Sequence, residues 1–413
     1  MRSLPQQHVS RAAFDAWRRE EGAPLERFAL HQALSDLHGP YWSSWPIALR
    51  DPDSAEVREA AQALAPEIAF HAWAQYEAER QLRAAGERAR MAGAEYGLYL
   101  DLAVGTHPFG AETWDDRSAF AFGASLGAPP DAFSADGQAW GVAPFNPRTL
   151  IETGFAALAE TLRRQMRFAR LIRIDHILGF DRAFWVPEEP GLPGAYVKMP
   201  LDAMLAVVRM EAARAGAVVV GEDLGNIPDG LQAALDASGI LGCRLIAFER
   251  DADAGFSFRL PEDYDAEALA SFATHDLPTW AGWRKGFEIE TRHALGLIDG
   301  ETRAAIQAER ARECAAFAAA GGGDTAAPDG MHAFLARTRS RLAAVQAEDI
   351  LALEEQPNLP GTTTEYPNWR RRLPVCAAAF ARNETLARAA AFMEEAGRGP
   401  HRQSETEQEP TWN

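Results

Sequence analysis

Cysteines and metal-type spacings are scarce in this chain of 413 residues. Its 3 cysteines, Cys243, Cys314 and Cys376, lie too far apart in sequence to form a metal-binding pair or a disulfide framework. The chain has no His-x-x-x-His or Cys-x-x-Cys pair that would suggest a zinc site. The sequence therefore gives no indication of a metal centre or of a disulfide-stapled scaffold.

Positive charge is also in short supply, with 41 Lys and Arg against 59 Asp and Glu. The formal net charge of −18 argues against nucleic-acid or anionic-membrane partners. No apolar run approaches membrane-spanning length, and the first residues lead into polar sequence rather than into the apolar part of a signal peptide. We expect a soluble cytoplasmic protein. The hydrophobic fraction of 47% is ample for a large core, in one domain with insertions or in two ordinary domains.

Three carboxylates each stand at the end of a short apolar run. Asp175, Glu222 and Asp276 follow such runs at a spacing that matches strand–helix–strand repeats with long loops. A short β-rich run that ends in a polar cluster is typical of a buried parallel strand. Carboxylates that meet at the C-terminal ends of barrel strands are what acid–base chemistry at a glycosidic bond requires.

Strand-like and helical patterns alternate along most of the chain, which predicts an α/β fold with a parallel sheet. The strand-like runs lie around residue 100 and at 171–177, 217–222, 244–249, 270–275 and 349–354. We expect a helical subdomain at 1–92 and a catalytic domain at 93–396. Within that domain, residues 123–150 include a stretch rich in Gly, Pro and Asp, typical of a functional loop such as a lid. Residues 397–413 are expected to form a disordered tail.

The residue types around these carboxylates suggest distinct roles. Residues two apart in a strand face the same way, so Arg173 would lie beside Asp175 and favour its ionised form, which suits a nucleophile. Four apolar residues and a glycine precede Glu222. Apolar surroundings would raise the pKa of Glu222, which suits a general acid that later acts as a base. Asp276 could hold sugar hydroxyls and stabilise positive charge on the ring.

Structural alternatives exist for each motif taken alone. Arg173 and Asp175 also fit a structural ion pair. Residues 276–279 also fit a helix start, with Asp276 as the N-cap and a proline in the first turn. Trp140 could simply pack its loop down. The order of the three motifs, each at the end of a strand-like run, favours an active site.

Together, these residues and several longer motifs resemble the amylomaltases, the 4-α-glucanotransferases of the α-amylase superfamily. The resemblance runs from about residue 14 to residue 373. Its motifs lie at 99–105, 127–131 with Phe133, 137–141, 173–176, 220–225, 242–244, 248–250, 274–279, 358–362 and 367–370. It implies a (β/α)8 TIM-type barrel with an inserted helical subdomain and a lid loop. It also implies a cytoplasmic enzyme, without metal or organic cofactor, that moves α-1,4-glucan segments between maltooligosaccharides.

The resemblance also implies residue roles. Asp175 matches the nucleophile, Glu222 the acid/base and Asp276 the transition-state stabiliser. Arg173 and His275 match residues that hold the nucleophile and the sugar, and Asp101 and His176 match further sugar-contacting positions. Gln138 and Trp140 lie in the segment that matches the lid, and Asn358 lies in a loop that resembles one lining the cleft.

One departure from the family concerns its opening segment, which ordinarily carries the first two barrel strands and a sugar-binding loop. We find neither here, and we count six strand-like runs where a closed barrel has eight. The expectation is an incomplete barrel with its first strands missing. Three functions remain open: a retaining glucanotransferase, a related α-glucan hydrolase, and a catalytically inactive truncated fragment. The lid-like segment favours transfer, because a closed lid excludes water.

Overall fold

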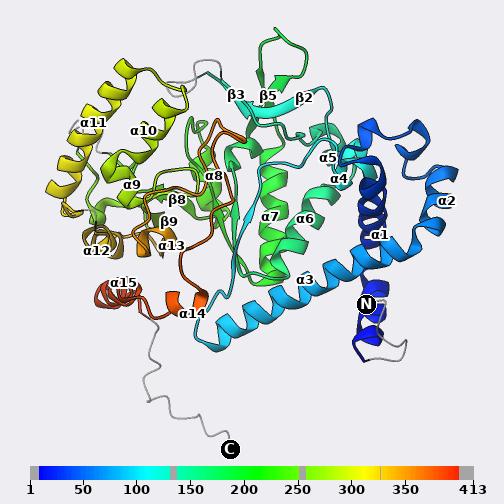
Figure 1. Ribbon diagram of the computed structural model, residues 1–413, viewed down its shortest axis with the longest axis horizontal. Coiled ribbons are helices and arrows are strands. Elements are labelled where there is room, and N and C mark those ends of the chain that lie inside the picture. Colours follow the sequence, from blue (N-terminus) through cyan, green and yellow to red (C-terminus); the bar gives the residue numbers. More distant parts are fainter. Residues whose placement is uncertain (1–8, 131–136, 251–256, 326, 400–413) are drawn as a thin grey trace, which may run out of the picture. The chain divides into compact units, whose positions relative to one another are not determined.

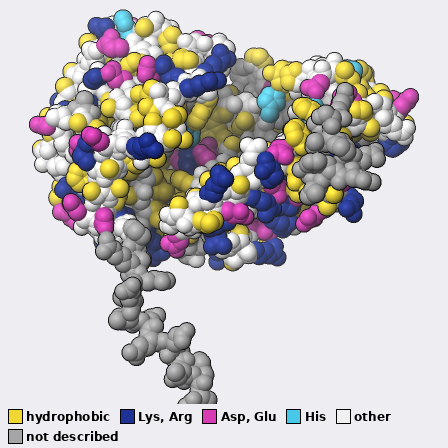
Figure 2. Space-filling model, turned by 60° about the horizontal axis from the view of Figure 1, so that its bottom comes forward, with side chains coloured by type: hydrophobic (Ala, Val, Ile, Leu, Met, Phe, Trp, Pro, Cys, Tyr) yellow, Lys and Arg dark blue, Asp and Glu magenta, His cyan; other side chains and the backbone are white. Residues whose placement is uncertain are grey.

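The computed structural model describes residues 9–130, 137–250, 257–325 and 327–399. The chain divides into two compact units, Met1–Ile240 and Leu241–Asn413. Residues 131–136 of the predicted lid segment, among them Asp131 and Phe133, and residues 400–413 of the predicted tail lie outside the described part. No helix in the described ranges combines the length and apolar character that a membrane span needs. The face shown in Figure 2 mixes acidic, basic and apolar side chains over its described surface.

The first unit begins with helices, as the sequence predicts for this region. They are α1 (Val9–His38), α2 (Ala55–Ala63) and α3 (Ala65–Met91). Helix α1 contacts α3, and the two are drawn in blue in Figure 1. Their shared core buries Phe14, Trp42 and Trp45, and it also takes in Trp114 from the later helix α4 (Ala111–Asp115). The helical segment is therefore tied to the rest of its unit by a buried tryptophan.

A three-stranded parallel sheet follows, in the order β1-β4-β7. Its strands are β1 (Tyr99–Leu102), β4 (Leu171–Ile174) and β7 (Val218–Gly221). Every residue of β4 is buried, Arg173 included, as is typical of the central strand of a parallel sheet. The further helices of this unit are α5 (Pro147–Glu152), α6 (Ala156–Met166), α7 (Leu201–Ala215) and α8 (Leu231–Ala237). Helix α6 lies against α7, and side chains of both join one hydrophobic core with the sheet (Figure 1).

A four-stranded antiparallel sheet takes two of its strands from the segment that composition predicts as a long loop. Its order is β3-β2-β5-β6, with β2 (Ala124–Ala128), β3 (Gln138–Ala139), β5 (Arg182–Pro187) and β6 (Ala195–Lys198). The loop prediction is therefore wrong for β2 and β3. One glycine there serves close packing, because a Cβ at Gly127 would lie 2.0 Å from the carbonyl oxygen of Gln138. In this segment, glycine therefore permits the close packing of β2 and β3 and not only turns.

The second unit carries another three-stranded parallel sheet, in the order β10-β9-β8. Its strands are β8 (Gly242–Leu245), β9 (Ala268–Ser271) and β10 (Leu342–Ala344). Its helices are α9 (Trp280–Lys285), α10 (Phe287–Ala294), α11 (Gly300–Ala319), α12 (Asp329–Arg337), α13 (Ala347–Ile350), α14 (Ala377–Phe380) and α15 (Glu384–Glu395). Five short 3-10 helices complete the described elements of the chain, at Trp42–Ser44, Ile47–Leu49, Arg117–Ala119, Ile177–Phe180 and Pro261–Asp263.

The two parallel sheets account for six strands in the described ranges, and five of them lie where the sequence predicts. The strand predicted at 349–354 is wrong, because residues 347–350 form helix α13 and the strand lies earlier, at β10. The run from Ile350 to Leu353 is too short for its periodicity to distinguish a buried strand from a buried helical turn.

Candidate active site

Strands β1 and β4 bring three charged side chains together in the first unit. The parallel register places Asp101 beside Arg173, and Asp175 follows β4 directly. Nη1 of Arg173 donates to Asp101 Oδ1 and Oδ2 at 2.7 and 2.9 Å. Nη2 of Arg173 lies 2.7 Å from Asp175 Oδ1. The predicted pairing of Arg173 with Asp175 is therefore present, and the same guanidinium also holds Asp101.

Glu222 follows β7 directly, and backbone groups hold its carboxyl on both sides. The backbone N–H of His176 donates to Glu222 Oε2 at 2.9 Å, and that of Leu224 donates to Oε1 at 3.1 Å. The residue is only 9% exposed. Burial, and next the charge of Asp175, raise the pKa of Glu222 to about 7, against the opposing effects of Arg173 and the two N–H donors. This is the direction that the apolar run before Glu222 predicts.

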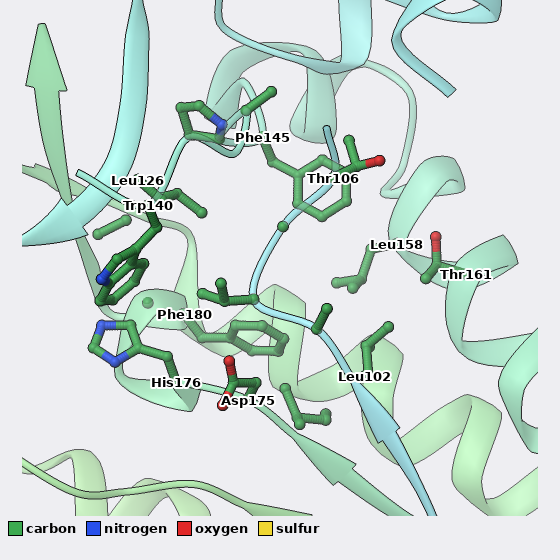
Figure 3. Close-up of a pocket in the computed structure, with 18 of the residues that line it drawn as sticks. Leu102, Thr106, Leu126, Trp140, Phe145, Leu158, Thr161, Asp175, His176 and Phe180 are labelled. Atoms are coloured by element: carbon green, nitrogen blue, oxygen red, sulfur yellow. The ribbon is translucent and has the colours of Figure 1, made fainter. Parts of the chain in front are cut away.

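His176 makes the turn between Asp175 and the short helix that follows. Its φ of 47° lies in the left-handed region. Its ring meets the ring of Trp140 edge-on, with centroids 5.1 Å apart and planes at 82° (Figure 3). Burial lowers the pKa of His176 and outweighs the opposing charge of Asp175, so the ring is neutral at pH 7. Nε1 of Trp140 donates to Gln138 Oε1 at 3.1 Å, which links the two residues predicted for the lid.

Asp101, Trp140, Asp175 and His176 line a cavity of about 310 Å³. In Figure 3 the carboxylate of Asp175 points into this cavity, with Phe180 beside it. Much of the remaining wall is apolar, and includes Leu102, Leu126, Phe145 and Leu158. A mostly apolar cavity with a few convergent polar groups is the usual form of a small-ligand site.

Asp276 lies in the second unit, in the loop after β9. Its Oδ1 accepts a hydrogen bond from Asn358 Nδ2 at 2.6 Å, and its Oδ2 lies 3.3 Å from His275 Nε2. The N-cap of α9 is Thr279, whose hydroxyl accepts from the backbone N–H of Gly282 at 3.0 Å. The alternative in which Asp276 caps the helix is therefore wrong.

Sequence analysis missed the residues that fix this loop. Gln356 donates from Nε2 to the carbonyl oxygens of Asp276 and Asn358, at 3.5 and 2.6 Å. Asp349 accepts from the backbone N–H of Trp280 at 2.6 Å. Burial of Asp349 raises the pKa of its carboxyl to about 7. Gln356 lies two residues before Asn358, which begins the motif at 358–362, but only spatial contact shows what it holds.

The structure thus brings the sequence-predicted residues together in two sets, one in each unit. In the first unit, the bridge Asp101–Arg173–Asp175 and the pairs His176–Glu222, His176–Trp140 and Gln138–Trp140 are in contact. In the second unit, His275 and Asn358 both contact Asp276.

A family model described as 4-alpha-glucanotransferase matches residues 2–377. The chain belongs to the 4-alpha-glucanotransferase family. A glucanotransferase from Mycobacterium tuberculosis strain H37Rv is 38% identical over 380 residues, which cover 89% of this chain and 52% of the relative. One from Haemophilus influenzae is 31% identical over 380 residues, covering 88% and 54%. The chain thus spans about half the length of these curated relatives.

Solved structures agree with this family assignment. The amylomaltase of Corynebacterium glutamicum superposes with a TM-score of 0.81 at 31% identity, covering 95% of this chain and 57% of that one. An amylomaltase from Streptococcus agalactiae, solved in complex with acarbose, gives a TM-score of 0.79 at 19% identity, covering 95% and 76%. At that identity the second likeness concerns the fold alone. The predicted α/β class and the amylomaltase fold are therefore confirmed.

The raised pKa of Glu222 predicts a pH-dependent stability. Below about pH 4.5 both the folded and unfolded states are protonated at this group. Between 4.5 and about 7 the unfolded state ionises while the folded state keeps its proton, so the free energy of unfolding falls. The full difference corresponds to about 3 kcal/mol. The free energy of unfolding of Glu222→Gln, relative to that of the parent, should therefore rise by up to about 3 kcal/mol from pH 4.5 to pH 8.

Urea unfolding at both pH values measures this gain. The matched control is Glu87→Gln on α3, whose residue is exposed and whose difference from the parent should not change with pH. If the difference between Glu222→Gln and the parent also does not change with pH, burial does not perturb the titration of Glu222.

Proposed function

We propose that this chain carries the catalytic carboxylates of a 4-α-glucanotransferase that works by retaining double displacement. The observation that supports this most directly is the contrast between two neighbouring acids. Asp175 is paired with a guanidinium, whereas Glu222 is buried with its pKa raised to about 7. One group is thereby suited to attack and the other to carry a proton at neutral pH.

In the first step, Asp175 attacks the anomeric carbon while Glu222 protonates the glycosidic oxygen. The glycosidic bond breaks, a glycosyl ester forms on Asp175, and the leaving sugar departs with the proton. In the second step, Glu222 takes the proton of an acceptor hydroxyl, whose oxygen attacks the anomeric carbon and releases the Asp175 carboxylate. Two inversions at one carbon retain the α-configuration.

The backbone contacts of Glu222 support both of its proton transfers. The N–H groups of His176 and Leu224 fix both carboxyl oxygens and thus the direction in which the proton is presented. Arg173 holds Asp175 in place through Nη2, so the nucleophile does not need to be ordered when substrate arrives.

We assign Asp276 the role of stabilising positive charge on the sugar ring, with His275 and Asn358 fixing its carboxylate. Arg173, Asp101 and His176 would position the sugar, and Gln138 and Trp140 would belong to a lid within 123–150. The substrates proposed are α-1,4-glucans and maltooligosaccharides. The acarbose complex of the Streptococcus agalactiae amylomaltase supports sugar binding in this fold. The family resemblance also leads us to propose a cytoplasmic enzyme.

Asp175→Asn should abolish glucan transfer and leave the fold intact, because it removes the attacking charge and keeps the side-chain shape. The assay is production of glucose and longer oligomers from maltotriose, with circular dichroism and melting temperature as measures of folding. Asp236→Asn, an exposed position in α8, should behave as the parent. Near-parental turnover by a folded Asp175→Asn variant would reject the nucleophile assignment.

The pH dependence of kcat/KM should have an alkaline limb near pH 7, because Glu222 must be protonated to assist the leaving group. Above that pH the rate should fall about tenfold per pH unit. Glu222→Gln should lose about 10²–10⁴-fold on maltotriose and lack this limb. With glucosyl fluoride, whose leaving group needs little protonation, formation of the intermediate should recover while its breakdown stays slow. Equal losses on both donors would count against the acid/base role.

Trp140→Ala should raise the ratio of hydrolysis to transfer. Loss of the indole removes its contact with His176 and its hydrogen bond to Gln138, so water competes better for the glycosyl intermediate. Free-glucose and reducing-end assays on a maltooligosaccharide measure the ratio, and Trp140→Phe is the conservative control. An unchanged ratio in Trp140→Ala would mean that Trp140 only packs its segment.

A further inference from the structure

Trp369 combines an exposed position with an unusual backbone conformation. Its side chain is 65% exposed. Its φ of 57° lies in the left-handed region, which L side chains rarely adopt. It belongs to the second unit and follows the loop that carries Asn358. An exposed aromatic side chain in a strained backbone gains little from burial, so packing alone does not account for it.

The surrounding loop fixes this conformation through several hydrogen bonds. The backbone N–H of Trp369 donates to the carbonyl oxygen of Pro357 at 3.0 Å. Asn368 accepts from the backbone N–H of Leu359 at 2.9 Å and donates to the hydroxyl of Thr362 at 2.9 Å. Tyr366, which is buried, donates its hydroxyl proton to the carbonyl oxygen of Gln356 at 2.9 Å. The indole is therefore presented from a well-anchored loop.

The indole is presented beside the loop of Asp276. Its ring centroid lies 5.0 Å from that of His275, which in turn contacts Asp276. Trp369 and His275 line a cavity of about 710 Å³ in this unit. Its charged lining residues are Glu348, Glu355, Arg371 and Arg372.

The lining suits a neutral polyol better than an ion. Arg371 Nη1 lies 3.0 Å from Glu355 Oε1, so the positive charge of Arg371 and the negative charge of Glu355 compensate each other. Glu348 and Arg372 add a second carboxylate and a second guanidinium. Hydroxyl groups can accept from guanidinium groups and donate to carboxylates, whereas an anion or cation would face a like charge as well.

We propose that Trp369 is the stacking platform of a glucan subsite next to His275, with a glucose ring of the α-1,4-glucan on its exposed face. The apolar C–H face of the pyranose ring covers the indole, and its rim hydroxyls reach Glu348, Glu355, Arg371 and Arg372. This subsite rests on the proposed function and adds a binding surface beyond the catalytic carboxylates. Covering about 50–60 Å² of apolar surface corresponds to roughly a tenfold change in affinity.

The test is calorimetric binding of maltoheptaose to the full chain carrying Asp175→Asn, so that turnover does not interfere. In this background Trp369→Gly and Trp369→Ala should each raise Kd about tenfold. Trp369→Phe should restore most of the affinity. Glycine adopts the local φ without strain, so Trp369→Gly should melt within about 2 °C of its parent or above it. The matched control is Phe70→Ala, an aromatic residue of α3 that is 58% exposed, and it should bind as the parent.

Turnover separates this proposal from the proposed function. With Asp175 intact, Trp369→Gly should raise KM for maltoheptaose about tenfold and change kcat less than about twofold. Absence of transfer by the parent rejects the glucanotransferase assignment, and the binding experiment still decides the platform. Parental affinity in Trp369→Gly, or no binding by the parent, overturns the platform. So does a loss of affinity in every variant, Trp369→Phe included, together with lower melting temperatures, because that pattern belongs to a structural residue.

Discussion

The Arg173 guanidinium, which lies between the carboxylates of Asp101 and Asp175, is the constraint on which the first unit's site depends. A charged group this buried is stable only because it is paired on both sides. Its partners come from β1 and from the end of β4, so the ion pairs also connect two neighbouring strands where the sheet ends. The pair with Asp101 therefore links this sheet edge to the chemistry proposed at Asp175.

The same guanidinium takes part in setting the proton affinity of Glu222. Burial and the charge of Asp175 favour the protonated acid, whereas Arg173 and two backbone N–H groups favour the carboxylate. Burial is the largest of these influences, and the resulting pKa is about 7. During the proposed reaction the charge of Asp175 disappears as the glycosyl ester forms. One of the influences that raise the pKa of Glu222 is then lost, so its pKa falls and the residue becomes a stronger acid in the step in which it donates a proton.

Much of the parallel framework could be predicted from sequence, because buried strands are rich in apolar residues and five of the six observed strands overlap the predicted runs. The runs before Asp175 and Glu222 show this, and both residues follow their strands directly. The antiparallel pair β2–β3 could not be predicted, because glycines that permit close strand packing look the same in sequence as glycines that form turns. The alternative in which Asp276 begins a helix arises from a similar ambiguity. Asp276 and Thr279 are both good caps, and only the contact with Asn358 shows that Asp276 is engaged elsewhere.

The contact between Gly127 and Gln138 has a consequence for how this enzyme family can change. No side chain larger than hydrogen fits between the two strands, so variation at Gly127 would push away the segment that carries Trp140. Gly137 is under a similar limit, because a Cβ there would lie 2.7 Å from the carbonyl oxygen of Ala128, whereas positions 138 and 140 already carry side chains. Substitutions should therefore mostly yield folded variants at positions 138 and 140 and mostly misassembled ones at 127. The backbone geometry of the sheet would then decide which positions tolerate substitution.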